Sequence, residues 1–511
     1  MRYVIKQRSL ILAQGLWMLF SLVAVCYYFL LKTNPSDIDI LAFCYLFVLQ
    51  AVWSVWSWYA ATRMPLYNPY ILFLIACYLF NCGQCFLYAF GLQPQGILDG
   101  KFSLELLVKT HAFIFAAISF FHGGALFRAC ISKKSSFVGH WENEKSHQGV
   151  VLEGKAVFKS GLFVFLLVCI PSVYLLAKYA QTVWTSGYMG LYQMEDTATR
   201  QFAVLRESCS LLLASLLFMY AGVKNDKKLS WPVFAVIGIL CCLYLFLGVR
   251  SRAVMMFLMA FWLYIQCRAK KVKEKRWLSS VAVWGIAIAF LTIFPAIWTV
   301  RNLPGSERFN LSAFAMAFAN IQEHPLILSI REMGGTMQTV AYTIALVPSV
   351  RPYGFGSSYG WALMTVIPNF YFFSVHPAAA HKLADWLVWT VDPGWASLGG
   401  GLGYSIFAEA YYNFGWFGGS LIMLVFGWLI AMLCLWWWEK QDSPLRQAFV
   451  AAAFSFLLFL PRSETQNLFR PLFWYAGVLY FFATRIFLRG KRLVRRENSS
   501  RVKMVDRGVC S

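Results

Sequence analysis

Apolar residues in this chain gather into long runs that are separated by short polar stretches. A run of about 20 such residues is long enough to cross the hydrocarbon core of a bilayer as an α-helix. The pattern therefore predicts an all-α polytopic membrane protein with about 12 transmembrane helices. The expected helices are 9–31, 38–61, 69–91, 104–127, 158–177, 202–223, 230–248, 253–267, 277–297, 416–437, 447–460 and 471–488.

The composition agrees with this pattern and excludes a soluble protein. Hydrophobic residues make up 59% of the 511 residues and charged residues only 13%, whereas a soluble domain carries about 25% charged residues. The 13 cysteines lie mostly within apolar runs, so no disulfide framework is expected. Cys82 and Cys85 form a CxxC motif inside an apolar helix. We interpret them as small packing residues and not as a metal or redox pair.

The charge distribution orients the predicted helices. With the N-terminus in the cytoplasm, the connectors on that side hold 30 Lys and Arg against 9 Asp and Glu, whereas the outer connectors and helix mouths hold 15 against 14. Cytoplasmic loops of membrane proteins carry such an excess of cations. Both termini are therefore expected in the cytoplasm, and the net charge of +22 needs no nucleic-acid partner to explain it.

Most predicted connectors are short, but 298–400 forms an outer loop of about a hundred residues. Unstructured loops of this length are uncommon in compact proteins. We expect an ordered cap that contains short interfacial helices. Helix-like stretches are predicted at 312–330, 336–348 and 377–389. The expected division of the chain is a membrane bundle of about nine helices at 1–297, the cap at 298–400, C-terminal membrane helices at 401–490 and a basic cytoplasmic tail at 491–511.

Arginine is concentrated on the outer face, where few cations are expected. A planar guanidinium binds a phosphate or carboxylate through two parallel hydrogen bonds, which a lysine cannot do. Arg252, Arg462 and Arg470 lie at the ends of three different spans, so they can meet at one cavity. The alternatives are ion pairs with outer acids or contacts with lipid phosphates. The outer arginines are Arg250, Arg252, Arg301, Arg308, Arg331, Arg351, Arg462 and Arg470.

A line of polar residues crosses the apolar segment that follows the glycine-rich run at 399–403. Ser405, Glu409 and Asn413 recur every four residues and so share one face of a helix. An ionisable residue in such a setting is a candidate functional group. The alternative is that Glu409 pairs with an outer arginine to hold the fold. A continuous helix from 403 to 437 would be about 50 Å long, so a break is expected near Gly415.

At these residues the chain resembles the Wzy family of O-antigen polymerases, bacterial inner-membrane enzymes that polymerise lipid-linked oligosaccharide repeat units. The resemblance covers roughly residues 180–475. It implies a GT-C-like bundle with a large periplasmic loop and an inverting, metal-independent glycosyltransferase that uses an undecaprenyl-diphosphate-linked donor. The matching features are GVRSR at 248–252, REMGGT at 331–336, Pro368–Asn369, the segment 399–415 and Arg462 with the following Ser and Glu.

The chemistry of such a reaction assigns expected roles to the polar residues. A lipid diphosphate leaves without a general acid, so cationic groups that stabilise its charge are the main requirement. We expect Arg331 and Arg462 to act in catalysis, with Glu409 as the base or orienting acceptor for the sugar hydroxyl. No metal or cofactor is expected. Asp392 and Glu332 follow Glu409 as candidates for this base, and His376 and His381 are weaker candidates. The expected substrate-binding residues are Arg250, Arg252, Arg301, Glu332, Asn369, Asp392, Ser405, Asn413 and Arg470.

Asp37 and Asp39 require a separate interpretation, because other GT-C enzymes carry a catalytic or metal-binding acid in the first outer loop. Ser36 and the two acids also fit the N-terminal cap of the second span. We favour the cap.

Two other functions remain open at this stage. An O-antigen ligase would perform the same chemistry with lipid A–core as the acceptor. A flippase for lipid-linked glycans would need a cationic cavity through the centre of the bundle, whereas the strongest polar features lie only on the outer side. The family resemblance also implies a chain-length regulator and a flippase as partners, beside the lipid bilayer and the lipid-linked substrates.

Overall fold

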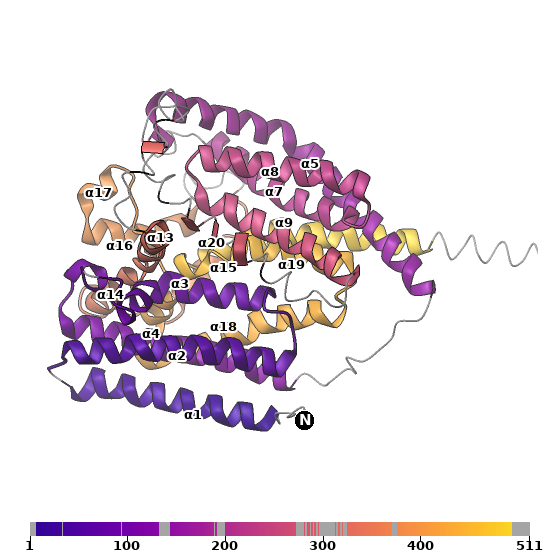
Figure 1. Cartoon of the computed structure of the whole chain (residues 1–511). Helices are drawn as coiled ribbons and strands as arrows, with labels where there is room; N and C mark the ends of the chain where they lie inside the picture. The colour runs from indigo at the N-terminus through magenta and orange to yellow at the C-terminus, as the bar shows by residue number, and fades with distance from the viewer. Residues whose placement is uncertain are drawn as a thin grey trace, which may run out of the picture.

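The computed structural model is a bundle of α-helices, and no strand occurs in the part of the chain that it describes (Figure 1). The described residues are 7–131, 144–191, 200–271, 324–369 and 376–492, without 33, 94 and 189, together with 281, 284–286, 288, 289, 291, 292, 295, 312, 315, 316 and 319. The side chains of 144–148, 200–204, 250 and 267–271 lie outside this description.

Ten helices among these residues are long and apolar enough to cross a membrane, which confirms an all-α polytopic fold. They are α1 (Gln7–Cys26) continued by η1 (Tyr27–Leu31), α2 (Asp37–Thr62), α3 (Pro69–Ala89), α4 (Leu104–Ile131), α5 (Glu144–Ser186), α7 (Arg200–Val223), α8 (Lys227–Phe246), α18 (Ile406–Glu439), α19 (Pro444–Leu457) continued to η4 (Leu460–Arg462), and α20 (Gln466–Pro471) continued by η5 (Leu472–Gly477) and by helical residues as far as Arg492.

These ten helices correspond to ten of the twelve predicted spans. The predicted span 253–267 is a shorter apolar stretch, Ser251–Gln266, within α9 (Arg250–Lys271). Most of the predicted span 277–297 lies outside the described residues.

The centre of the bundle depends on the close crossing of α4 and α18. Gly124 of α4 faces the backbone at Leu424, and Gly427 of α18 faces the backbone at Phe121. A Cβ atom at either glycine would overlap a carbonyl group of the opposite helix. Membrane helices that pack closely use such small residues, because their backbones can then approach each other.

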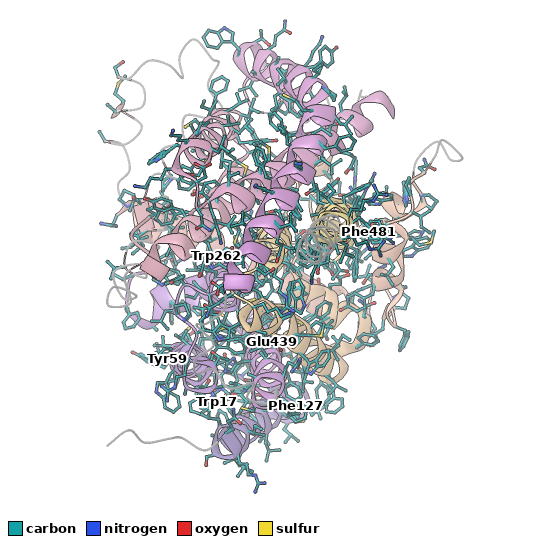
Figure 2. The ribbon with its side chains drawn as sticks, turned by 90° about the vertical axis from the view of Figure 1, so that its right-hand side faces the viewer. Trp17, Tyr59, Phe127, Trp262, Glu439 and Phe481 are labelled. Atoms are coloured by element: carbon teal, nitrogen blue, oxygen red, sulfur yellow. The ribbon has the colours of Figure 1, made fainter. Side chains whose placement is uncertain are left out.

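The outer helices present apolar side chains outward. Tyr59, Phe127 and Phe481 are each more than two-fifths exposed, whereas Trp262 is fully buried against Trp437. Figure 2 shows Trp262 among the packed helices and the other three nearer to the perimeter. This distribution suits a bundle whose perimeter contacts lipid.

Short helices gather at one end of the bundle, and the first and last described residues lie at the opposite end (Figure 1). The prediction of a helix at 336–348 is confirmed by α14, whereas α15 was not predicted. Only part of the predicted helix 312–330 is described, and its last six residues form the beginning of α13. The short elements are η2 (Ile97–Gly100), α13 (Pro325–Gly334), α14 (Met337–Leu346), α15 (Ser357–Met364), η3 (Pro377–His381), α16 (Leu383–Val391) and α17 (Pro393–Ser397).

Candidate functional site

Helix α18 breaks at Gly415, as the sequence predicts. Gly415 adopts φ 66° and ψ −164°, a conformation that glycine tolerates best. The break frees the carbonyl groups at the end of the first segment of the helix. They accept hydrogen bonds from the N–H groups of Gly354 and Phe355, at 2.9 Å and 3.0 Å. The loop before α15 is thereby attached to α18.

Glu409 lies at the centre of this first segment and is 0% exposed. Its Oε1 accepts hydrogen bonds from the hydroxyl groups of Ser358 and Thr465, each at 2.7 Å. Its Oε2 accepts one from the backbone N–H of Thr465, also at 2.7 Å. These partners are hydroxyl and amide groups, so no arginine appears among the hydrogen-bonding partners that the described residues give Glu409.

Asn413 and Ser405 extend the same polar line in both directions. Asn413 donates to the Ser358 hydroxyl at 2.7 Å and accepts from the N–H of Gly356 at 2.9 Å. Ser405 donates to the side-chain oxygen of Asn81 at 2.8 Å. All three residues of the predicted line are 0% exposed. Their hydrogen bonds attach α18 to α3, to α15 and to the turn before α20.

Glu464, in that turn, is a second buried carboxyl group. Its Oε2 accepts from the N–H of Leu383 at 2.8 Å, and its Oε1 has no partner among the described residues. Burial and the nearby Glu409 carboxylate raise the pKa of Glu464 to about 8. We expect it to be largely protonated at neutral pH. Glu464 belongs to the family motif that begins at Arg462, but no role was predicted for it from the sequence.

A cavity of about 500 Å³ opens beside this turn. It lies between α7, α9, α19, η3 and α20, and its wall carries several cations. Arg470 is 3.3 Å from Glu207, so one acid is already paired with one of these cations. We call this cavity the cationic pocket. Its basic and acidic lining residues are Arg206, Glu207, Arg252, His376, Lys382 and Arg470.

A second cavity, of about 290 Å³, adjoins the first. Ser251, Met255 and Phe459 line both. Most of its other lining residues are apolar, and α3 contributes five of them. Glu332 and Arg462 are its charged residues. We call it the apolar pocket. Along α3 it runs from Leu72 to Phe80, which is about 12 Å of helix.

The structure brings together part of the predicted arginine cluster. Arg252 and Arg470 line the cationic pocket, and Arg462 lines the adjoining apolar pocket. The backbone and side chain of Arg462 also lie beside Gly403, whose φ is +72°. The glycine-rich run therefore approaches an arginine closely.

Other predicted residues lie apart from the two pockets. Arg331 precedes Glu332 on α13 and is half-buried, but it lines neither pocket. Asn369 also lines neither pocket. Asp392 is exposed and caps α17 by accepting from the N–H of Trp395 at 2.9 Å. The side chain of Arg250, and all of Arg301 and Arg308, lie outside the described residues.

Arg351 has aromatic neighbours. Its guanidinium lies 4.8 Å from the ring centre of Trp386 and 4.9 Å from that of Tyr412. These contacts are cation–π interactions. They hold the loop after α14 against α16 and α18.

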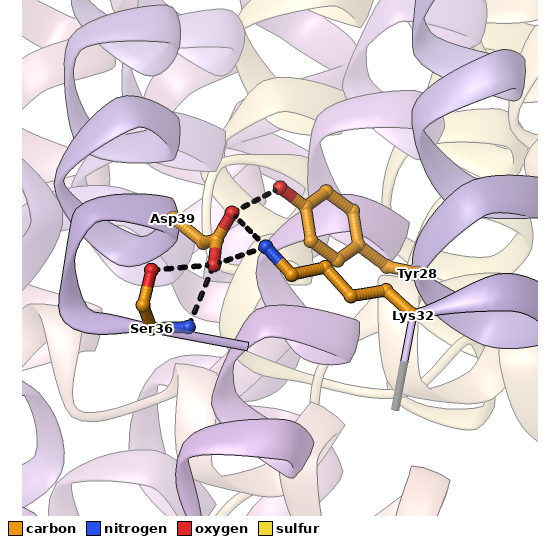
Figure 3. Close-up of polar contacts among 4 residues, drawn as sticks. All are labelled: Tyr28, Lys32, Ser36 and Asp39. Atoms are coloured by element: carbon orange, nitrogen blue, oxygen red, sulfur yellow. Dashed lines mark hydrogen bonds and ion pairs between the residues drawn. The ribbon is translucent and has the colours of Figure 1, made fainter. Parts of the chain in front are cut away.

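Asp39 forms the predicted helix cap. Its carboxylate accepts hydrogen bonds from the backbone N–H of Ser36 at 2.6 Å and from the Tyr28 hydroxyl at 2.7 Å, and it forms an ion pair with Lys32 (Figure 3). The cap interpretation of Ser36 and the following acids is thus confirmed for Asp39.

Arg206 and Glu207 were not predicted from the sequence as site residues, yet they bring charge from α7 into the cationic pocket. They fall inside the predicted span 202–223. Charged residues within a span usually face the interior of a bundle, so their position was an available signal. Among the described residues, the one group with the spacing of metal ligands is Cys44, Cys85 and His111. It lies outside both pockets.

Comparisons with known proteins identify the family of the chain through a family model. No curated protein and no solved structure matches the chain significantly. The model of the O-antigen polysaccharide polymerase family, Wzy, matches residues 15–491, which is nearly the whole chain. The match includes both pockets and the buried polar line of α18, and it covers all or most of each of the ten long apolar helices. The chain therefore belongs to the O-antigen polysaccharide polymerase Wzy family of multi-pass membrane glycosyltransferases.

Proposed function

We propose that the protein joins oligosaccharide repeat units carried on undecaprenyl diphosphate, at the periplasmic face of the bacterial inner membrane. The termini then lie in the cytoplasm, and the end that carries α13–α17 faces the periplasm. Family membership supports the polymerase reaction. The excess of Lys and Arg in the connectors at the end with the termini supports this orientation, because cytoplasmic loops carry most of the cations.

The single observation that carries the proposal is the contact between the cationic and the apolar pocket. A polyprenyl diphosphate joins a doubly charged group to a long apolar chain. Arg252 and Arg470 suit the oxygens of the diphosphate, and the wall from Leu72 to Phe80 suits the first isoprene units. The shared residues Ser251, Met255 and Phe459 mark the boundary at which the two parts of such a lipid join.

In the proposed step, a hydroxyl oxygen of the acceptor sugar attacks C1 of the donor sugar from the side opposite the diphosphate. The C1–O bond to the diphosphate breaks, and the diphosphate leaves with the electron pair. Inversion at C1 follows from this geometry. Arginines beside the diphosphate stabilise the charge that develops, and each charge-assisted hydrogen bond contributes roughly 1.5–3 kcal/mol.

The hydroxyl proton passes to a carboxylate. Glu409 was the predicted base, but it is fully buried, accepts three hydrogen bonds and lines neither pocket. The geometry supports a positioning role for Glu409, because it holds the turn whose residues Ser463 and Gln466 line the cationic pocket. We propose Glu207, the carboxylate that lines the cationic pocket, as the group that receives this proton. Glu332 lines the apolar pocket beside Arg462, where the lipid chain is proposed to lie. The reaction centre so described uses no metal.

The location of the pockets favours an enzyme over a flippase. The charged lining residues come from the beginnings of α7 and α9 and from the segments near η3 and α20. Of these segments, η3 and α20 both pack against the short helix α15. A separate flippase and a chain-length regulator are accordingly proposed as partners.

The test is polymerisation by the full-length protein in liposomes that contain a defined undecaprenyl-diphosphate-linked repeat unit. We expect Arg252→Lys and Arg470→Lys to lower the rate at least tenfold, because a lysine loses the bidentate contact. Arg63→Lys, at the opposite end of the bundle, is the matched control. Wild-type rates in both pocket variants, or a requirement for lipid A–core as acceptor, would contradict the proposal.

A further inference from the structure

Three side chains from three membrane helices meet in a fully buried cluster away from the two pockets. Cys44 of α2, Cys85 of α3 and His111 of α4 place their ligand atoms within 4.8 Å of one another. Each of the three residues is 0% exposed. The sulfur of Met337, at the start of α14, lies 4.0 Å from the sulfur of Cys85. Four separate elements thus bring three sulfur atoms and one imidazole together.

The orientation of His111 leaves one ring nitrogen available as a ligand. Its Nδ1 contacts the carbonyl oxygen of Leu107, one turn earlier in α4. A carbonyl only accepts, so Nδ1 carries the proton and Nε2 keeps its lone pair. Nε2 faces the sulfur of Cys85 at 3.3 Å. Histidines that bind metals usually show this arrangement, in which a backbone or carboxylate oxygen holds the other ring nitrogen.

The donor atoms define the class of ion. Thiolate, thioether and imidazole ligands favour Zn²⁺ or Cu⁺, whereas Mg²⁺ and Ca²⁺ require oxygen ligands. The charge also balances in a buried site, where net charge is costly. Two thiolates neutralise Zn²⁺, and one thiolate neutralises Cu⁺. In each case, every metal–sulfur bond to a thiolate forms as the corresponding S–H proton is released to solvent.

We propose that Cys44, Cys85 and His111 bind a thiophilic metal ion, with Met337 as an adjacent soft ligand. Bond lengths of about 2.3 Å to sulfur and about 2.0 Å to nitrogen place neighbouring ligand atoms roughly 3.5–3.8 Å apart. The sulfur of Cys85 and Nε2 of His111, at 3.3 Å, are within about 0.2 Å of this separation, and small rotations of the cysteine side chains complete the site. The ion would join α2, α3 and α4 to α14, which packs against α18, and would act as a structural tie.

Cys82 provides a matched control within the same CxxC motif. It is 1% exposed and lies on α3, one turn before Cys85, but it is not part of the cluster. A site built by the cluster predicts that Cys85→Ser and Cys44→Ser abolish metal binding and that Cys82→Ser does not. An adventitious thiol–metal interaction predicts similar losses for all three variants.

The experiment measures metal bound to the full-length protein, purified in detergent under reducing conditions without an affinity tag that binds metal. Mass spectrometry of the elements is expected to find about one Zn or Cu per chain. The metal-free protein is then titrated with Zn²⁺ in one arm and with Cu⁺ in the other. Addition of Co²⁺ should produce a sulfur-to-cobalt charge-transfer band, and this band should be absent from Cys44→Ser and Cys85→Ser.

Several results would overturn the proposal. The first is wild-type protein that binds neither ion and gives no cobalt band. The second is a Cys44–Cys85 disulfide in protein purified without reductant, with no metal bound after reduction. The third is retention of the band in Cys85→Ser. The wild-type measurements decide the matter even if a variant fails to fold.

Discussion

The two buried carboxyl groups beside Thr465, those of Glu409 and Glu464, and the arginines of the cationic pocket occupy contrasting environments. Glu409 and Glu464 are at most 1% exposed. The carboxylate of Glu409 accepts its three hydrogen bonds from Ser358 and Thr465, which are residues of the protein's own framework. Arg252 and Arg470 instead line an open cavity of about 500 Å³. The two carboxyl groups thus help to build the site, whereas the two arginines can contact a substrate. An ionisable residue in an apolar helix, such as Glu409, can therefore have a structural role without contacting the substrate.

The largest expected effect is the loss of activity when both pocket arginines are removed. Arg252→Ala combined with Arg470→Ala deletes two charge-assisted contacts of roughly 1.5–3 kcal/mol each, so we expect polymerisation to fall by about 10²–10⁴-fold. The melting temperature should fall only modestly. The partly exposed ion pair of Arg470 with Glu207 contributes less than about 1 kcal/mol, and Arg252 loses its contact with Tyr244. Parallel assays of turnover and thermal unfolding check this. A large drop in melting temperature would place these arginines among the residues that build the site.

Glu409→Ala should show the opposite balance. It leaves the hydroxyl groups of Ser358 and Thr465 and the N–H of Thr465 without their acceptor. A buried donor left without a partner costs about 1–3 kcal/mol, so a destabilisation of roughly 3 kcal/mol or more is expected. Glu409→Gln keeps one acceptor oxygen and should lose less. Thermal unfolding in detergent measures both variants. Normal stability of Glu409→Ala with no activity would restore the predicted role of this residue as the base.

The stability of the protein should fall as the pH rises toward 8. The pKa of Glu464 is about 8 in the folded protein, against an ordinary value of 4.5. Between these values the folded protein holds a proton that the unfolded chain has lost. The stabilisation is complete below about pH 4.5 and is lost as the pH rises through 8. Glu464→Gln resembles the protonated carboxyl group and should flatten this part of the stability profile.

The matched control for this pH effect is Glu439→Gln, at the far end of α18, which should leave the slope unchanged. The measurement is the melting temperature between pH 5 and 8.5 in one detergent, for the wild type and the two variants. An equal slope in Glu464→Gln and the wild type would show that another group controls the pH dependence.

The smallest expected effect is that of Arg351→Lys. Arg351 was among the outer arginines of the sequence analysis, yet its guanidinium lies between Trp386 and Tyr412. A lysine weakens these contacts, and the expected loss of stability is about 0.5–1 kcal/mol. Polymerisation should remain close to the wild-type rate. A loss of activity comparable to that of Arg470→Lys would place Arg351 with the substrate-binding cations.

Hydrophobic patterning predicted the fold well because each span is a local property of the chain. The same holds for the break at Gly415 and for the cap at Asp39, which depend on neighbouring residues alone. Helix α15 was missed, because its short sequence carries little periodic signal.

The site could be predicted only in part. The spacing of Ser405, Glu409 and Asn413 correctly indicates one face of a helix, but it says nothing about what that face contacts. The partners of Glu409 come from Ser358 and Thr465, about 50 residues away on either side. Similarly, the pocket arginines come from distant segments, so their convergence depends on tertiary packing.

The most direct test of the central claim is a cryo-electron microscopy map of the protein with an undecaprenyl-diphosphate-linked repeat unit bound. We predict density for the diphosphate between Arg252 and Arg470, with the polyprenyl chain continuing past Met255 along the α3 wall from Leu72 to Phe80. Density for the diphosphate at the end of the bundle that holds the two termini, or a lipid chain that leaves the apolar pocket empty, would contradict it.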